Sequence, residues 1–347
     1  MSDLASGLRS RVARSGEGLR AYPPELPGIV ALVADKLRRV DEECRRNLRS
    51  ELGAIDELGL YLADGGGKRV RPILLLLSSQ MCGYRGERDV LFATVFEFIH
   101  TATLVHDDVI DQADLRRGRG TMNARWGNGL TVLLGDYLYI KSMNMALEAR
   151  DIRIIDILAQ ITLKMIEGEI VADRRRADIE MTEQEHLEII RRKTAHLFAG
   201  CSRVAGVLAG VAPEKVEALA AYGMNLGMAF QIIDDLLDLT ADTSVLGKPV
   251  ASDLREGKLT LPLIYLLERG DPAERDMIRA VLEERDFLSV KREEIVELLR
   301  SRKTFERARA VAADYARRAR EGLDLFDPSP AREGLRLLPE FVLSRQY

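Results

Sequence analysis

Residues 104–111 read Leu-Val-His-Asp-Asp-Val-Ile-Asp, and residues 230–238 read Phe-Gln-Ile-Ile-Asp-Asp-Leu-Leu-Asp. Each string closes a segment, 90–105 or 216–233, that is apolar on nearly every side at helical spacing. Such segments predict helices that are buried all round. In each aspartate triplet the first and last residues share a helix face, about 6 Å apart along the axis.

Two carboxylates on one face can bridge Mg²⁺ ions, which prefer oxygen ligands and keep water and phosphate in their shell. A single triplet is equally typical of a solvated acidic helix end. Two triplets, each closing an apolar helix, favour ion binding because unpaired charges there would be costly. The two triplets, 107/108/111 and 234/235/238, therefore predict that ions or cationic ligands are bound at the ends of these helices.

The surrounding sequence predicts an all-α fold, a single large antiparallel helical bundle around a central cavity. Strand signals are nearly absent, and no Asn-Gly or Asp-Gly separates two alternating runs. Periodic apolar residues predict helices over 29–63, 70–81, 89–111, 129–148, 152–173, 182–211, 213–240, 259–268, 273–285, 290–300, 303–322 and 330–343. No linker divides the chain after residue 28. We expect a flexible arm over 1–28 and one helical domain over 29–347.

Composition narrows the function classes. The 347 residues include 51 Lys and Arg against 55 Asp and Glu, a net charge of -4, so the overall basic field of a nucleic-acid-binding protein is absent. No apolar run approaches the ~18 residues that span a bilayer, which argues against an integral membrane protein. Three scattered cysteines fit reduced thiols in a cytoplasmic protein.

Three basic groups accompany the aspartates. Lys68 and Arg71 follow a glycine-rich stretch at a helix start, which offers charge and free N–H groups to a phosphate. Arg116 and Arg117 follow the first triplet, and arginine forks suit diphosphate oxygens. Lys248 and Lys258 follow the second triplet. Read singly, the first two groups are equally compatible with ordinary loops or turns, but together the three predict a site for a diphosphate head with an apolar tail.

The chain at this point resembles the trans-isoprenyl diphosphate synthases, or polyprenyl synthetases, from about residue 60 to 265. Eight motifs carry the resemblance in register: Gly66-Gly-Lys-Arg-Val-Arg-Pro72, Leu104 to Asp111, Arg116-Arg-Gly118, Gly135-Asp-Tyr-Leu138, Glu167-Gly-Glu169, Lys193-Thr-Ala195, Gly227 to Asp238 and Gly247 to Pro262. The resemblance implies the isoprenoid synthase type of helical bundle, Mg²⁺ as cofactor with three ions per active site, and a homodimer.

The resemblance also implies roles for individual residues. Asp107, Asp111 and Asp234 would bind the Mg²⁺ ions that hold an allylic prenyl diphosphate. The other implied roles are contact with the allylic diphosphate (Arg116, Lys248, Lys258), binding of isopentenyl diphosphate (Lys68, Arg71, His100, Arg117) and contact with the reacting carbon (Lys193, Thr194, Gln231). Asp108, Asp235 and Asp238 would act beside or behind the metal ligands.

The implied reaction is head-to-tail condensation of isopentenyl diphosphate onto farnesyl or geranyl diphosphate. Metal and cations stabilise the leaving diphosphate, and a dry cavity protects the allylic cation. Ala102 and Thr103, one turn before the first triplet, would face the hydrocarbon tunnel. Neither is aromatic, and the string most resembles long-chain members that make octaprenyl or similar quinone side chains. The expected product has about eight isoprene units, within a range of seven to nine.

Other functions remain open from the sequence. A short-chain synthase making farnesyl or geranylgeranyl diphosphate shares every motif. An HD-type metal phosphohydrolase could use His106 with Asp107, although only four histidines exist in the chain. A regulatory subunit of a two-chain synthase would be expected to lack intact aspartate clusters, and a terpene cyclase would carry a different second motif.

Overall fold

The computed structural model describes residues 27–50, 53–65, 67–116, 118–240 and 250–345. Its main elements are helices, in the order α2 (Pro27–Ala31), α3 (Ala34–Asn47), α4 (Gly53–Asp64), α5 (Val70–Met81), α6 (Arg88–Ile110), α7 (Met122–Trp126), α8 (Asn128–Glu148), α9 (Ile152–Arg174), α10 (Glu183–Ile190), the π-helical turn η1 (Arg191–Ala195), α11 (His196–Ala209), α12 (Pro213–Thr240), α14 (Ser252–Arg255), α15 (Leu261–Arg269), α16 (Pro272–Glu284), α17 (Arg292–Ser301), α18 (Thr304–Glu321), the 3-10 turn η2 (Gly322–Leu325) and α19 (Pro330–Ser344). The predicted all-α fold is confirmed.

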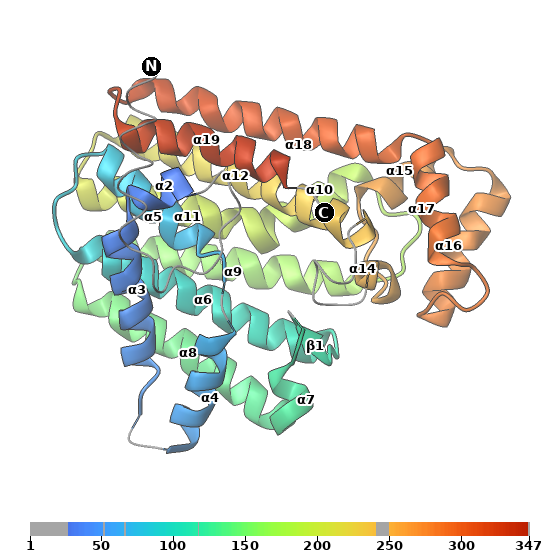
Figure 1. Ribbon diagram of the computed structural model, residues 1–347, viewed down its shortest axis with the longest axis horizontal. Coiled ribbons are helices and arrows are strands. Elements are labelled where there is room, and N and C mark those ends of the chain that lie inside the picture. The colour runs from blue at the N-terminus through green and yellow to red at the C-terminus, as the bar shows by residue number, and fades with distance from the viewer. Residues whose placement is uncertain (1–26, 51–52, 66, 117, 241–249, 346–347) are drawn as a thin grey trace.

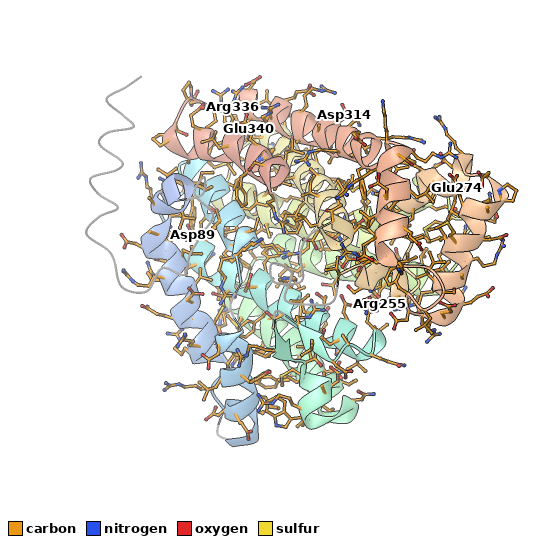
Figure 2. All side chains as sticks on the ribbon, turned by 45° about the vertical axis from the view of Figure 1, so that its right-hand side comes forward. Asp89, Arg255, Glu274, Asp314, Arg336 and Glu340 are labelled. Carbon is orange, nitrogen blue, oxygen red and sulfur yellow. The ribbon has the colours of Figure 1, made fainter. Side chains whose placement is uncertain are left out.

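The centre of the bundle is built by α6, α11 and α12. In Figure 1, α18 and α19 run along the top over α12, while α6 and α8 lie below α9 and α11. The core residues of α6 and α12 are buried along most of each helix, as their all-round apolar sequence predicts. Charged residues such as Asp314 on α18 and Glu340 on α19 lie toward the outer side of the molecule (Figure 2). This arrangement leaves the carboxyl ends of α6 and α12 facing a common space.

Two hydrophobic clusters fill the described part of the chain. The larger joins helices from α2 to α12 with α18 and α19. The smaller lies around α15, α16 and α17 and includes Leu239 from the end of α12. Because α12 contributes residues to both hydrophobic clusters, we propose that residues 29–347 form a single domain.

One predicted helix is wrong. The stretch 29–63 forms three helices, α2, α3 and α4, because α4 folds back against the end of α3. Gly59 permits this close approach: a Cβ atom there would lie 2.9 Å from the Cβ of Leu48. The Asp56 carboxylate accepts a 2.7 Å hydrogen bond from the backbone N–H of Ser50 and fixes the new start. Periodicity continues across such a break, so the sequence pattern cannot report it.

The N-terminal arm and a small hairpin also differ from the sequence-based prediction. Residues 1–26 of the predicted arm lie outside the described residues, and its last two residues, Pro27 and Gly28, begin α2. A two-residue antiparallel pair, β1 (Leu115–Arg116) with β2 (Arg119–Gly120), forms where no strand is predicted. It is too short to carry a period-2 signal and serves as a turn after α6.

The helix α12 has the length and hydropathy of a membrane span. Its most apolar window is 56% buried inside the bundle, where it packs between α11 and α18. A central core helix meets the same criteria as a span, so this feature is weak support for membrane insertion.

Candidate active site

A cavity of about 1540 Å³ lies between the carboxyl half of α6 and the facing helices α9, η1 and α12. Most of the predicted site residues line it: Lys68, Arg71, His100, Thr103, Asp107, Asp111, Arg116, Lys193, Thr194, Gln231, Asp234 and Lys258. Segments separated by up to 190 residues of sequence are therefore brought together as predicted. Arg117 and Lys248 lie outside the described residues. Ala102 is buried at 3% exposure and is not among the lining residues described.

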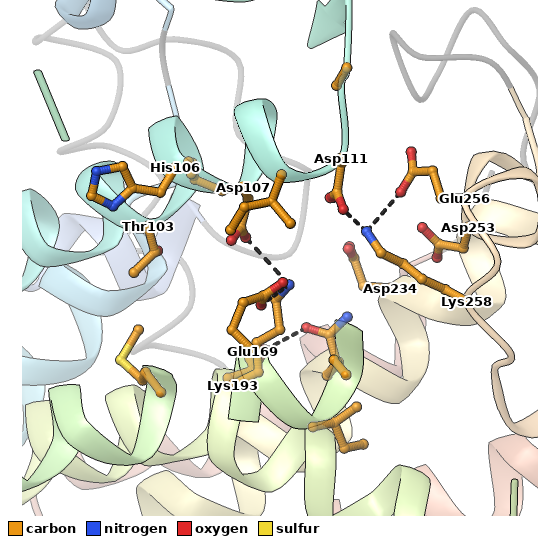
Figure 3. Close-up of a pocket in the computed structure, with 18 of the residues that line it drawn as sticks. Thr103, His106, Asp107, Asp111, Glu169, Lys193, Asp234, Asp253, Glu256 and Lys258 are labelled. Carbon is orange, nitrogen blue, oxygen red and sulfur yellow. Dashed lines mark hydrogen bonds and ion pairs between the residues drawn. The ribbon is translucent and has the colours of Figure 1, made fainter. Parts of the chain in front are cut away.

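The first aspartate of α6 meets a cation from the opposite wall. The Nζ atom of Lys193 lies 3.5 Å from Asp107 Oδ2 and also pairs with Glu169 of α9 (Figure 3). Burial raises the pKa of the Asp107 carboxyl to about 6; Lys193 opposes the rise, and Glu169 and Asp111 add to it. Asp107 is thus an acid whose charge is costly without a cation close by.

Asp111, at the end of α6, is held by two cations. Arg176 donates to one carboxylate oxygen at 2.7 Å and Lys258 to the other at 2.6 Å. Burial acts to raise the pKa of Asp111, but Lys258 and Arg176 outweigh it and keep the pKa below its ordinary value. The third aspartate of this cluster, Asp108, is buried behind the other two and accepts a 2.7 Å hydrogen bond from Arg116.

The second cluster divides its aspartates among three tasks. Asp234 faces the cavity and pairs with Arg345, the residue after α19, at 3.1 Å. Asp235 is buried and accepts a hydrogen bond from Gln231 at 2.8 Å. Asp238 is buried too, and it fastens α14 by accepting from Ser252 Oγ at 2.9 Å and from the backbone N–H of Asp253 at 3.1 Å.

The carboxylates suit a hard divalent cation such as Mg²⁺, since the residues facing the cavity from both walls offer oxygen donors. Figure 3 shows Asp107 and Asp111 on one side and Asp234 on the other, with Lys193 and Lys258 among them. Within the described residues, no three His, Cys, Asp or Glu side chains are grouped closely enough to hold a metal ion. In this arrangement the carboxylates that face the cavity are paired with Lys193, Lys258, Arg176 and Arg345.

The polar groups beside Lys193 lie on the π-helical turn. The hydroxyl of Thr194 donates to Gln231 Oε1 at 2.8 Å, which links η1 to α12. Gly168 lets α9 approach this turn: a Cβ there would lie 2.7 Å from Arg192 Cβ and 2.8 Å from the backbone N of Lys193. π-Helical turns of this kind are frequent at functional sites. The close approach of α9 to η1 at Gly168 places the next residue, Glu169, beside Lys193.

The basic end of the cavity is formed at the start of α5. Lys68 is exposed, and the Arg71 guanidinium lies 4.8 Å from the ring centroid of Phe198. Arg69 anchors the loop, because its partly buried guanidinium bonds Asp41 at 2.8 Å and also pairs with Glu97. A fixed loop with outward cations is suited to bind a phosphate group at the cavity mouth.

Several ionisable cavity residues were not predicted, among them Glu169, Arg176, His186 and Arg345. Glu169 stands in the Glu167-Gly-Glu169 motif, for which the resemblance implied no role. Arg176, His186 and Arg345 carry no motif, and only the folded contacts reveal them. A run of three arginines, 174–176, was the one available signal for Arg176.

The HD-type alternative finds no support in this geometry. His106 Nε2 lies 3.1 Å from the carbonyl oxygen of Val132, and its ring fills the space against Gly135, where a Cβ would come within 2.2 Å. The histidine therefore locks α6 to α8 instead of facing Asp107 across a metal.

An all-helical bundle whose two central helices present aspartates to a cation-lined cavity defines an enzyme of the isoprenoid synthase class. The chain belongs to the polyprenyl synthetase family, whose model matches residues 53–299. The resemblance predicted from the motifs is thereby confirmed, and the chain is a prenyltransferase.

Individual relatives extend the match over more than nine-tenths of the chain. Octaprenyl diphosphate synthase of Escherichia coli K12 is 37% identical over 320 residues, which cover 92% of this chain and 99% of that protein. Polyprenyl synthase of Caulobacter crescentus CB15, solved with calcium and isoprenyl diphosphate, matches with a TM-score of 0.89 and 35% identity over 95% of this chain and 100% of that one. Decaprenyl diphosphate synthase of Rhodobacter capsulatus matches with a TM-score of 0.85 and 37% identity over 91% and 97%.

Proposed function

We propose that the chain is a long-chain all-trans polyprenyl diphosphate synthase with a product of about eight isoprene units, made for quinone side chains. The observation that carries the proposal is the cavity itself, where Asp107 and Asp111 face Asp234 among cations. Similarity to octaprenyl and decaprenyl diphosphate synthases supports a long product. A short-chain product is the alternative that shares all of these residues.

In the proposed site, Asp107, Asp111 and Asp234 hold Mg²⁺, with three ions as the family pattern suggests. Bound Mg²⁺ supplies Lewis-acid stabilisation of the diphosphate as its bond to the allylic carbon breaks. Lys193 and Lys258, once released from their carboxylates, bind the same diphosphate, together with Arg116 and Lys248.

The second substrate, isopentenyl diphosphate, binds at the mouth. Lys68 and Arg71 at the start of α5 hold its diphosphate with Arg117, and His100 lies two turns before Asp107 on α6. The double bond of isopentenyl diphosphate attacks the allylic carbon, and the condensation product then loses a proton to the departing diphosphate.

Between the two diphosphates, oxygen dipoles stabilise the developing allylic cation. Thr194 and Gln231 supply them from η1 and α12. Apolar lining residues, including Met165, Ile166 and Ile190, keep water away from the cation and accept the prenyl tail. Thr103, one turn before Asp107, lines the cavity and could therefore limit the length of the prenyl product. Ala102 is packed in the core and does not line the cavity.

We also propose a cytoplasmic homodimer that binds no nucleic acid. Its interface would lie on α8 and α9, whose outer faces expose apolar residues outside the cavity: Leu133, Ile140 and Leu147 at helical spacing on α8, and Leu163 on α9. Apolar faces of this extent are typical of protein interaction sites. A net charge of -4 supports the absence of nucleic-acid binding.

The test is product analysis with the purified chain, farnesyl diphosphate and labelled isopentenyl diphosphate. With Mg²⁺ we expect all-trans products centred near eight units, and with a chelator none. A regulatory subunit would give no product alone. Products that stop at farnesyl or geranylgeranyl diphosphate would overturn the long-chain proposal and favour the alternative.

A further inference from the structure

A chain of four polar side chains, three of them buried and Gln231 partly buried, runs beside the proposed reacting carbon. It begins at His186 on α10, passes through Asp235 and Gln231 on α12, and ends at Thr194 on η1. The Nε2 atom of His186 lies 3.3 Å from Asp235 Oδ2, and both side chains are 8% exposed. We call these four residues the polar relay.

The relay fixes which way the Gln231 amide points. A carboxylate only accepts hydrogen bonds, so Asp235 must receive the NH₂ group of Gln231, at 2.8 Å. The amide oxygen then faces Thr194 and accepts its hydroxyl proton at 2.8 Å. The Thr194 oxygen therefore keeps its lone pairs for the cavity, where a cation develops.

A reversed amide would change the sign of these dipoles. With its NH₂ group toward Thr194, Gln231 would donate to the hydroxyl oxygen and direct positive ends at the reacting carbon. Asp235 prevents this reversal only while its own position is fixed, because a carboxylate free to turn could leave the amide.

His186 is placed to hold that carboxylate. Its buried Nε2 atom lies 3.3 Å from Asp235 Oδ2 without the alignment of a hydrogen bond, and the described residues give it no other hydrogen-bond partner, so a small turn of the ring would aim it at this carboxylate. The start of α10 is rigid, because Thr182 and Glu185 form a reciprocal capping box and the N–H of His186 bonds Thr182 O at 3.0 Å. Nε2 can donate to Asp235 in either the neutral or the charged form of the ring.

We propose that His186 is a positioning residue for prenyl transfer, which orients Gln231 and Thr194 through Asp235. The inference rests on the proposed function and adds a residue outside the motifs. It predicts that His186 affects the chemical step while the binding of both diphosphates stays unchanged.

The experiment compares His186→Phe, which keeps a ring and loses the donor, with His186→Gln, which keeps a donor. We expect kcat of His186→Phe to fall about 10- to 100-fold, a range typical of outer partners of functional groups, with both KM values within about two-fold. His186→Gln should recover most of the loss. The control is His196→Phe, a half-buried histidine at the start of α11 whose ring approaches Arg191. Its backbone N–H bonds the carbonyl oxygen of Thr194, a contact that the substitution keeps, so its kcat should match the wild type.

A cycle with Asp235→Asn tests the route of the effect. If His186 acts through Asp235, the double variant should be no slower than Asp235→Asn alone. Should His186→Phe fail to fold, His186→Met supplies an apolar side chain with more freedom, and Tm is recorded for every variant.

Several outcomes would overturn the inference while leaving the function intact. They are an unchanged kcat in His186→Phe, a loss confined to Tm or KM, no recovery in His186→Gln, or additive losses in the cycle. A wild-type chain that makes no prenyl product would instead refute the proposed function.

Discussion

At the scale of single residues, the site is a set of carboxylates that are paired with cationic side chains of other segments. Asp107 shares Lys193 with Glu169, Asp111 shares Lys258 and Arg176, and the more exposed Asp234 pairs with Arg345. These cations make the buried carboxylates tolerable before metal and substrate arrive. If Mg²⁺ replaces the lysines at these carboxylates, Lys193 and Lys258 become available to bind the incoming diphosphate.

The raised pKa of Asp107 predicts a pH-dependent affinity for Mg²⁺. Because the pKa of its carboxyl is about 6, a proton competes with the metal below that pH. We expect the apparent Mg²⁺ affinity to rise between about pH 5 and pH 7 and then to level off. Calorimetric Mg²⁺ titrations at both pH values, in the presence of a diphosphate, would measure it.

The stability of the metal-free protein should respond in the opposite direction. The folded-state pKa of Asp107 lies above the unfolded value near 3.9, so the folded chain binds more protons between about pH 4 and pH 6. The contribution of this group to stability is therefore present at low pH and declines as pH rises through that window. An Asp107→Asn variant should lose both dependences; retention of the affinity change would contradict the assignment.

At the scale of helices, the apolar patterns were sufficient to predict α5, α6, α8, α9 and α12 nearly to the residue. Periodicity reports which side of a helix is buried, and these helices are long and strongly patterned. It could not predict the π-helical turn at 191–195, since these five residues, Arg-Arg-Lys-Thr-Ala, include too few apolar side chains for one extra residue to show as a shift in the pattern. The contacts of Lys193 and Thr194 depend on that turn.

The close contact between α9 and η1 gives a prediction at this scale. In Gly168→Ala the new Cβ would collide with Arg192 Cβ and the Lys193 backbone, so the turn must shift. We expect about 1–3 kcal/mol of lost stability and a clear fall in kcat, from melting curves and steady-state kinetics. The control, Gly129→Ala on α8, meets nothing within 4 Å and should leave both unchanged. Normal activity in Gly168→Ala would show that the contact is not needed.

The two small residues on α6 should respond differently to enlargement. Thr103 lines the cavity, so Thr103→Tyr should block the tunnel and shorten the product by several isoprene units. Ala102 is 3% exposed and packed in the core, so Ala102→Tyr should mainly lower Tm through overpacking. Chromatography of the products and melting curves separate the two effects. A shortened product from Ala102→Tyr alone would reverse this assignment.

At the scale of the whole molecule, the family resemblance predicted which distant helices meet, whereas apolar periodicity predicts only single helices. The order and spacing of the motifs were sufficient to predict that α6, η1 and α12 line one cavity. Arg176, His186 and Arg345 could not be predicted, because each reaches the site through a contact between elements far apart in the chain. The outward apolar faces of α8 and α9 likewise become visible only once the bundle has buried the opposite sides.

Those faces predict the assembly state. Leu133→Glu combined with Ile140→Glu places two charges on the exposed face of α8, where a second copy would cover them. Light scattering should give twice the 38.8 kDa chain mass for the wild type and a single chain mass for the double variant. Leu288→Glu, on a similarly exposed residue away from this face, is the control and should stay dimeric. A monomeric wild type would refute the proposed interface.

The most direct test of the account is a crystal structure of the chain with Mg²⁺ and an unreactive thio analogue of farnesyl diphosphate. The account predicts Mg²⁺ bound between the diphosphate and the carboxylates of Asp107, Asp111 and Asp234, with Lys193 and Lys258 moved from those carboxylates to diphosphate oxygens. A diphosphate bound elsewhere, or aspartates that keep their lysine and arginine partners with no metal between the two helices, would contradict it.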